Sequence, residues 1–269
     1  MAETTKPRSI LVAVPTTGGM MKAKTAESLV GLMKVLTKAG INADLHNINN
    51  SDIVTVRNLY ANMVLESDRW DSLLFIDSDM RFAPRLVSRM LRLNGLVMAA
   101  ACTKRHIDLE KFGAAMREHG DFERAKAESV HFNTLLSWNN REKSLLKHRD
   151  GFYTMAAVGM AVCLIHKAAL QAMVDEGAVE VRQDVYEGVV KKSWAFFDFV
   201  KFSGMTLTED YSFCHRWTHV MKRPLWVCVD EIVDHIGDFD YSGRYSLMLE
   251  RLLQSVPKEQ LADAGTDSE

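Results

Sequence analysis

The sequence predicts an α/β fold, with one domain built on a mostly parallel central sheet and helices on both faces of that sheet. Three observations support this prediction. Short apolar runs alternate with segments whose apolar residues recur at helical spacing. The apolar runs are nearly continuous, as in strands that are buried on both faces. A chain of 269 residues is also long enough to bury one large core.

The strands are predicted from short apolar runs that end in turn or polar residues. Residues 9–14 (SILVAV) are rich in β-branched side chains, and Pro15 to Gly19 supply turn chemistry directly after them. The run SLLFI at 72–76 ends abruptly in an aspartate. The strands predicted in this way are residues 9–14, 41–48, 72–76, 95–102, 158–165 and 225–229.

The helices are predicted from apolar stripes and from capping residues at their ends. Gly40 is suited to end the first helix, Ser51 or Asp52 to cap the second, and Pro84 to occupy the first turn of the third. Residues 179–192 are expected to form either a hairpin or a meandering loop. The predicted helices are residues 20–39, 52–67, 84–93, 167–176, 207–221 and 242–253.

The composition restricts the partners and the compartment. The formal net charge is -2, so no global basic field attracts nucleic acid or anionic lipid. No stretch approaches the roughly 20 apolar residues of a membrane span, and residues 1–9 lack the plan of a secretory signal. The 4 cysteines are scattered without a CxxC pair. We therefore expect a cytoplasmic protein without a transmembrane segment, whose cysteines are reduced and mostly buried.

The sequence Asp77-Ser78-Asp79 is the main chemical signal. It places two carboxylates at the carboxyl end of a buried strand, which is the edge where open α/β sheets bind ligands. Neighbouring carboxylates repel each other, and hard oxygen ligands favour Mg²⁺ or Mn²⁺. The pair therefore predicts a cation that also contacts a phosphorylated ligand. The alternative is that one aspartate caps the next helix and the other is solvated.

Three further signals lie elsewhere in the chain. Glu209 and Asp210 stand at the start of a helix, where a carboxylate could accept a proton from a hydroxyl group, or could simply suit the helix N-terminus. His235 follows the last predicted strand and could be either a metal ligand or a structural residue. Arg57 offers a planar fork for phosphate or a nucleobase, or lies on a solvated helix face.

The order and kind of these features resemble GT-A-type glycosyltransferases, particularly the small bacterial and phage-borne members. The resemblance covers most of the chain outside residues 103–150. It implies a single GT-A, Rossmann-like domain that transfers a sugar from a nucleoside diphosphate sugar, with UDP-sugars favoured, to a hydroxyl acceptor. The stretches that carry it are ILVAVPTTGG, TVRNLYANMVLES, LLFIDSDMRF, VGMAVCLIHKAAL, LTEDYSFCHRW and DHIGDFDYSG.

The resemblance also implies roles for individual residues. Asp77 and Asp79 are similar to the Asp-x-Asp motif that binds Mn²⁺ or Mg²⁺ and the donor, and His235 is similar to a late metal-binding histidine. Asp210 is similar to the base of inverting members, while in a retaining enzyme Asp210 or Glu209 would instead stabilise the oxocarbenium-like species. The sequence leaves inversion and retention open.

Further residues are implied to lie against the donor or the acceptor. Gly159 and Met160 fall in the strand that borders the acceptor in this family. The residues implied to line the nucleotide are Pro15, Thr16, Thr17, Arg57, Asn58, Asp77 and Ser78.

On this interpretation one glycosyltransferase domain covers residues 1–258, and a disordered tail covers 259–269. The segment 103–150 is polar and weakly periodic, so it is either a solvated, partly helical excursion or a lid that closes over bound donor. The parts of the domain are a nucleotide-binding half at about 8–102, the insertion at 103–150, an acceptor-side half at 151–241 and a C-terminal helix at 242–255.

Two alternative functions remain open. A nucleotidyltransferase that makes nucleotide-sugars also combines an α/β sheet with paired carboxylates, and a non-catalytic nucleotide-sugar-binding protein could keep the same fold. The acceptor could be a glycan, a lipid-linked glycan or a modified base in DNA. Three roles are open for the apolar face of the C-terminal helix. It packs on the core of its own domain, it forms the contact of a homodimer, or it contacts a membrane surface.

Overall fold

The computed structural model describes residues 8–139, 146–186, 189–237, 240–254 and 261–263. Within these residues a nine-stranded sheet has the order β2-β1-β3-β12-β5-β17-β10-β9-β20. Only β12 and β10 run opposite to the other strands. The strands are β1 (Ser9–Thr16), β2 (Asn42–Asn49), β3 (Ser72–Ile76), β5 (Val97–Ala100), β9 (Leu146–Arg149), β10 (Phe152–Thr154), β12 (Val162–His166), β17 (Trp226–Cys228) and β20 (Leu261–Asp263).

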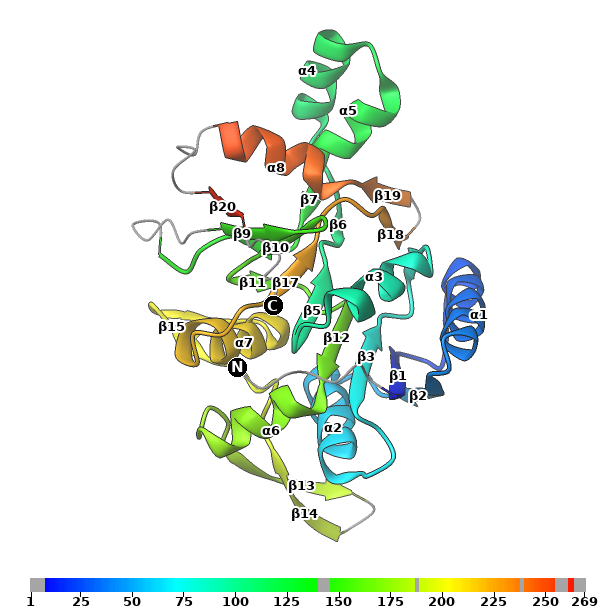
Figure 1. Ribbon diagram of the computed structural model, residues 1–269. Coiled ribbons are helices and arrows are strands. Elements are labelled where there is room, and N and C mark those ends of the chain that lie inside the picture. The colour runs from blue at the N-terminus through cyan, green and yellow to red at the C-terminus, as the bar shows by residue number, and fades with distance from the viewer. Residues whose placement is uncertain (1–7, 140–145, 187–188, 238–239, 255–260, 264–269) are drawn as a thin grey trace.

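Helices cover both faces of this sheet, so the predicted α/β class is confirmed (Figure 1). Alternate residues of β1 point to opposite faces, because side chains alternate along a strand. Leu11 and Ala13 belong to the core under α2 (Ile53–Glu66), α6 (Lys167–Asp175) and α7 (Glu209–Cys214). Ile10 and Val12 belong to the core under α1 (Ala23–Lys38) and α3 (Arg85–Leu93).

A second, three-stranded sheet stands at the carboxyl end of β3, and the sequence did not predict it. Its order is β19-β18-β4, from β4 (Met80–Phe82), β18 (Val233–Ile236) and β19 (Asp240–Gly243). The register pairs His235 with Met80. This small sheet therefore brings residues that are far apart in the sequence to the same edge of the central sheet.

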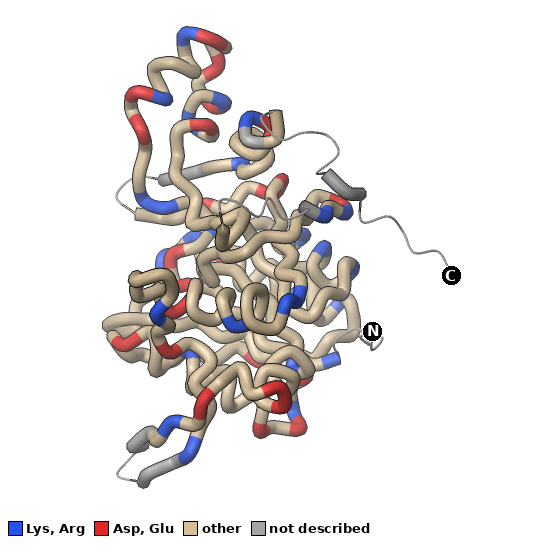
Figure 2. The backbone as a smooth tube through the Cα atoms, turned by 90° about the vertical axis from the view of Figure 1, so that its left-hand side faces the viewer, with Lys and Arg blue, Asp and Glu red and all other residues tan. Residues whose placement is uncertain are grey.

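The insertion at 103–150 begins with a helical hairpin. The strands β6 (Thr103–Ile107) and β7 (Val130–Phe132) pair around α4 (Leu109–His119) and α5 (Phe122–Ser129). The two helices project away from the central sheet, and residues of both charge signs are distributed along them (Figures 1 and 2). The segment then forms β8 (Thr134–Leu135) and β9, so part of it belongs to the central sheet. Residues 140–145 lie outside the described residues.

Two predicted elements differ from the observed ones. The strand predicted at 158–165 is interrupted, because Gly159 donates its backbone hydrogen bond to the Asn133 carbonyl at 2.8 Å, and only residues from Val162 onward join the sheet. The two residues of β11 (Ala157–Val158), which precede the interruption, pair with β8 instead. The helix predicted at 207–221 is divided into α7 and a π-helical segment, His215–Val220.

The remaining elements lie nearer the C-terminus or at the periphery. Residues predicted as a hairpin or loop form the hairpin β13 (Val181–Tyr186) and β14 (Val189–Trp194), and a short pair follows in β15 (Lys201–Phe202) and β16 (Met205–Thr206). The C-terminal helix is α8 (Tyr245–Gln254). The tail expected to be disordered at 259–269 contains β20, whose backbone pairs with the edge strand β9.

No helix in the described residues combines the length and the apolar character that a membrane span requires. All four cysteines are buried and unpaired.

Candidate functional site

The sequence Asp77-Ser78-Asp79 forms the turn between β3 and β4. β3 is fully buried, and the backbone of Asp77 continues its pairing by donating to the Ala161 carbonyl at 2.8 Å. The backbone of Met80 donates to the Asp77 carbonyl at 3.2 Å, which closes the turn. The Ser78 carbonyl accepts from Lys22, the residue that precedes α1, at 2.9 Å. Both aspartates thus leave the sheet at its carboxyl edge, as predicted.

Asp79 lies beside His235, which comes from the neighbouring strand β18. Nε2 of His235 is 3.3 Å from Oδ2 of Asp79, and Nδ1 is 2.9 Å from the Thr103 carbonyl oxygen. A carbonyl oxygen only accepts hydrogen bonds, so Nδ1 carries the proton that it donates. Nε2 therefore points at the carboxylate. In neutral imidazole Nε2 presents a lone pair, so this contact requires either a second proton on the ring or a cation between the two groups.

Arg105, from β6, contacts the same carboxylate. Its guanidinium bonds Oδ2 of Asp79 and also donates to the Ile236 carbonyl at 3.0 Å. The Arg105 side chain is 44% exposed, so it can leave without breaking a packed core. Burial raises the pKa of Asp79, but the bond from His235 and the charges of His235 and Arg105 outweigh burial and lower that pKa overall. Asp79 is therefore an ionised carboxylate between two nitrogen-containing side chains.

Asp77 is paired with Arg57, a guanidinium only 3% exposed, on α2. Nη2 of Arg57 is 3.1 Å from Oδ1 of Asp77, and Nε is 3.5 Å from Oε1 of Glu209. The guanidinium also lies 5.0 Å from the centre of the Phe75 ring. Burial lowers the pKa of Arg57, but the charges of Asp77 and Glu209 outweigh burial and raise it. Arg57 therefore joins the end of β3 to the start of α7 as a permanent positive charge.

Glu209 and Asp210 occupy the first turn of α7 and have different surroundings. Burial raises the pKa of Glu209, and the neighbouring charge of Asp210 raises it further. The Asp210 carboxylate accepts hydrogen bonds from the Thr208 hydroxyl, from the Tyr211 backbone at 2.7 Å and from the Asn133 amide at 3.0 Å. Two of these bonds reach Oδ1 and one reaches Oδ2. Oδ2 therefore keeps capacity to accept another proton.

A cavity of about 520 Å³ lies against Asp210. Asn133 and Thr208, both bonded to the Asp210 carboxylate, line it. Trp138, Phe202 and Tyr211 supply aromatic walls. A concave space with aromatic walls and a few polar groups is suited to a small organic ligand.

The predicted nucleotide-lining residues lie in two other places. Thr16 ends β1 and its hydroxyl donates to Asn47 at 3.0 Å, Pro15 is buried in the same strand, and Thr17 is exposed in the turn that follows. Asn58 is buried, and its side-chain amide donates to Asp198 at 2.6 Å and accepts from the Phe197 backbone at 2.9 Å. The Asn58 amide therefore ties α2 to the aromatic segment at 194–202, and its predicted contact with nucleotide stays a prediction.

Two residues of the site were not predicted. Arg105 follows the carboxyl end of β5 by a few residues, and Asn133 follows β7. Arg105 follows an apolar run, as Asp77 does, so the same pattern could have identified it as a candidate. Asn133 has no comparable signal, because a short strand pair in the insertion places it. In the described residues no three His, Cys, Asp or Glu side chains converge as a complete cation site, so Asp77 does not join Asp79 and His235 in a cluster of three.

Comparisons with known proteins return distant similarities in fold. No family model and no curated protein matches the chain. A solved structure of A197 from STIV has a TM-score of 0.43 and 13% identity, covering 85% of this chain and 86% of that chain. TarS 1-349 from S. aureus in complex with UDP-GlcNAc has a TM-score of 0.37 and 12% identity, covering 87% of this chain and 58% of that chain.

GalNAc-T7 with UDP, GalNAc and Mn²⁺ has a TM-score of 0.40 and 10% identity, covering 87% of this chain and 44% of that chain. This chain thus spans less than two thirds of the length of these TarS and GalNAc-T7 structures. Two of these structures hold a nucleotide ligand, UDP-GlcNAc in the TarS complex and UDP with GalNAc and Mn²⁺ in GalNAc-T7. At these identities and TM-scores the similarity assigns no residue and no activity to the chain.

Proposed function

We propose that this chain is a metal-dependent glycosyltransferase that moves a sugar from a nucleoside diphosphate sugar to a hydroxyl group of an acceptor. The observation that carries the proposal is the contact between Asp79 and His235 at the carboxyl edge of β3. The Thr103 carbonyl fixes the ring so that Nε2 points at the carboxylate, and a backbone partner of this kind typically orients a metal-binding histidine. A carboxylate with an imidazole suits Mn²⁺ better than Mg²⁺.

In the proposed site, Asp79 and His235 bind the cation, and Asp77 contributes the lone pairs that Arg57 does not use. A bound divalent cation would act as a Lewis acid toward the departing diphosphate. Pro15 and Thr16 at the end of β1, with Thr17 in the turn that follows, would line the nucleoside. UDP is the favoured nucleotide because the sequence resemblance leans toward it.

The acceptor side of the proposal uses α7. Asp210 is the proposed base, since two of its hydrogen-bond donors, Asn133 and Thr208, line the cavity and three donors hold the carboxylate in place. A base must reach the hydroxyl whose proton it takes, and a hydroxyl in this cavity meets that condition. Glu209 is paired with Arg57, so its proposed role is to hold Arg57 between the donor side and the acceptor side.

The proposal is tested by incubating the protein with a panel of nucleoside diphosphate sugars, with and without Mn²⁺, and identifying the released nucleotide. We expect a nucleoside diphosphate to appear only when the divalent cation is present, through slow hydrolysis if no acceptor is added. Release of pyrophosphate from a nucleoside triphosphate and a sugar phosphate would instead establish a nucleotidyltransferase. Nucleotide binding without any release across the panel would establish a non-catalytic binding protein.

Arg105 gives a more specific prediction, because its guanidinium now occupies the carboxylate that the cation needs. Replacing it in Arg105→Ala should strengthen Mn²⁺ binding in the absence of nucleotide, since a competing positive charge is removed. The same variant should bind the nucleoside diphosphate with Mn²⁺ about tenfold more weakly, because a guanidinium is a strong partner for phosphate. Calorimetric titrations of Mn²⁺ alone and of UDP with Mn²⁺ measure the two effects.

The matched control for this prediction is Arg81→Ala. Arg81 is an exposed arginine on β4 that pairs with Asp234 at 2.8 Å, one residue before His235. The Arg81→Ala variant removes an equal charge near the site without freeing Asp79. Its affinities for Mn²⁺ alone and for UDP with Mn²⁺ should therefore both stay within about twofold of the wild type. Weaker Mn²⁺ binding in Arg105→Ala would contradict the competition described here.

A further inference from the structure

A second cavity adjoins the one that Asn133 and Thr208 line, with Trp138 in the wall of both. Its volume is about 430 Å³, and Ser137 and Trp138 line both cavities. The indole Nε1 of Trp138 donates to the Thr218 hydroxyl at 2.8 Å, which fixes the ring between them. The two spaces are therefore neighbours that share one aromatic wall, and one ligand can occupy both.

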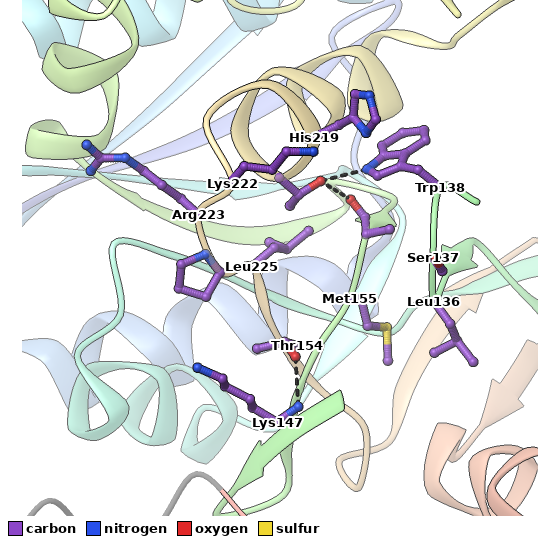
Figure 3. A pocket seen from close by; sticks show the side chains of 13 residues that line it. Leu136, Ser137, Trp138, Lys147, Thr154, Met155, His219, Lys222, Arg223 and Leu225 are labelled. Carbon is purple, nitrogen blue, oxygen red and sulfur yellow. Dashed lines mark hydrogen bonds between the residues drawn. The ribbon is translucent and has the colours of Figure 1, made fainter. Parts of the chain in front are cut away.

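The second cavity has a basic rim. Lys147, Lys222, Arg223 and His219 line it, and no aspartate or glutamate among the described residues does. Figure 3 shows Lys222 and His219 on the helical side of the cavity and Lys147 on the strand side. Arg223 contacts Glu176 outside the cavity, but neither lysine forms an ion pair with a carboxylate in the described part of the chain. Two ammonium groups thus face a space that offers them no negative partner.

The floor of the cavity is apolar. Met155, Leu225 and Leu136 line it, and Figure 3 shows Met155 and Leu225 between Lys147 and Lys222. Lysines that are only solvated do not require an apolar floor or an aromatic wall beside them. The combination is suited to a ligand that carries an anionic group next to a carbon skeleton.

The backbone of Lys222 supports a binding role for its side chain. Lys222 has a φ of 55° at the end of the π-helical segment, in the left-handed region. Glycine adopts this conformation at least cost, and helices commonly end with glycine at such a position. The chain carries a lysine there and directs it to the cavity, although a glycine would favour the local fold.

We propose that this second cavity binds a phosphate group of the acceptor, while a hydroxyl of the same acceptor reaches Asp210 through the neighbouring cavity. The second half of this statement rests on the proposed function, and the first half does not. Lysine binds phosphate as a point charge, so two lysines on opposite sides of a cavity can balance a phosphate monoester. The phosphate belongs either to a phosphorylated glycan or to a lipid-linked one.

The phosphate site is tested first without donor or metal. Glycerol 3-phosphate, octyl phosphate and neutral octyl glucoside are titrated calorimetrically into the wild type, Lys222→Gly, Lys147→Gln and the control Lys34→Gln, an exposed lysine on α1. We expect phosphate binding that each cavity variant weakens about tenfold and that Lys34→Gln leaves unchanged. Lys222→Gly should melt at the wild-type temperature or above, since glycine suits the positive φ.

The outcomes separate the possible sources of the phosphate. Tighter binding of octyl phosphate than of glycerol 3-phosphate indicates a lipid-linked acceptor, and the reverse order indicates a phosphorylated glycan. Failure of both phosphates to bind, or binding by Lys222→Gly and Lys147→Gln with the affinity of the wild type, overturns the phosphate site. Asp79→Asn should bind the phosphates like the wild type, so loss of the metal site and loss of this site are distinguishable.

The link to transfer is tested with pairs of acceptors. Each sugar phosphate that supports release of nucleoside diphosphate is compared with its dephosphorylated form. The KM for the phosphorylated form should be about tenfold lower in the wild type, and this difference should disappear in Lys222→Gly while kcat stays the same. Equal KM values for the two forms in the wild type would overturn the assignment of the phosphate to the acceptor.

Discussion

Asp79→Asn is expected to lower metal-dependent turnover of the donor by about a thousandfold, which corresponds to roughly 4 kcal/mol of transition-state stabilisation. The replacement has the same shape but loses the negative charge that faces Nε2 of His235 at 3.3 Å. A neutral amide is a much weaker ligand for a hard cation than a carboxylate. The measurements are the rate of UDP release from a UDP-sugar with Mn²⁺ and the Mn²⁺ affinity determined from the signal of free Mn²⁺ in electron paramagnetic resonance.

The matched control for this variant is Asp44→Asn. Asp44, on β2, also pairs with an arginine, since Arg69 lies 2.7 Å from its Oδ1. The charge change and the loss of an ion pair are the same, so a general effect of either would appear in both variants. We expect Asp44→Asn to keep the turnover and the Mn²⁺ affinity of the wild type. Turnover by Asp79→Asn at the wild-type rate would remove Asp79 from the metal site.

The strand that delivers Asp77 could be predicted in full from the sequence. SLLFI is a fully buried strand, and it runs parallel to β1, as expected for the mostly parallel sheet that the alternation of strands and helices predicts. The sequence could not predict that β12 runs antiparallel between β3 and β5, because the pattern of apolar residues is the same for either direction. It also could not predict the interruption at Gly159, which depends on a contact with the insertion.

The sequence alone could not predict which residues pair with the acidic side chains. Asp79 meets His235 because β4 and β18 pair, and β4 is only Met80–Phe82, too short to give a periodic pattern. Arg57 was expected at the nucleotide, whereas its buried guanidinium connects Asp77 with Glu209. A spacing along the chain identifies candidate charges, but only the fold decides which opposite charges neutralise them.

The candidate site thus contains two acidic groups at the carboxyl edge of β3 and two on α7, with Arg57 between the sets. Removing one partner of a buried ion pair leaves a costly unpaired charge, so Arg57 couples the geometry of Asp77 to that of α7. This coupling holds the end of β3 and the start of α7 around one guanidinium, although the two are far apart in the sequence.

Asp210→Asn is expected to lower transfer to the acceptor by about a thousandfold, which is within the range for loss of a general base. Slow hydrolysis of the donor should remain, because the proposed metal ligands are untouched. The fold should also remain, since the amide oxygen can keep the bonds from Thr208 and from the Tyr211 backbone, and Asn133 can turn its amide to present oxygen to the new NH₂ group.

The control for this last prediction is Glu209→Gln, the same change one residue earlier. Glu209 reaches Arg57 at 3.5 Å rather than the cavity, so its replacement should cost transfer less than about tenfold. The ratio of transfer to hydrolysis, measured for both variants with one donor, separates the two carboxylates. If Glu209→Gln abolishes transfer and Asp210→Asn does not, the base is Glu209, and the hydrogen bonds that hold Asp210 serve only to begin α7.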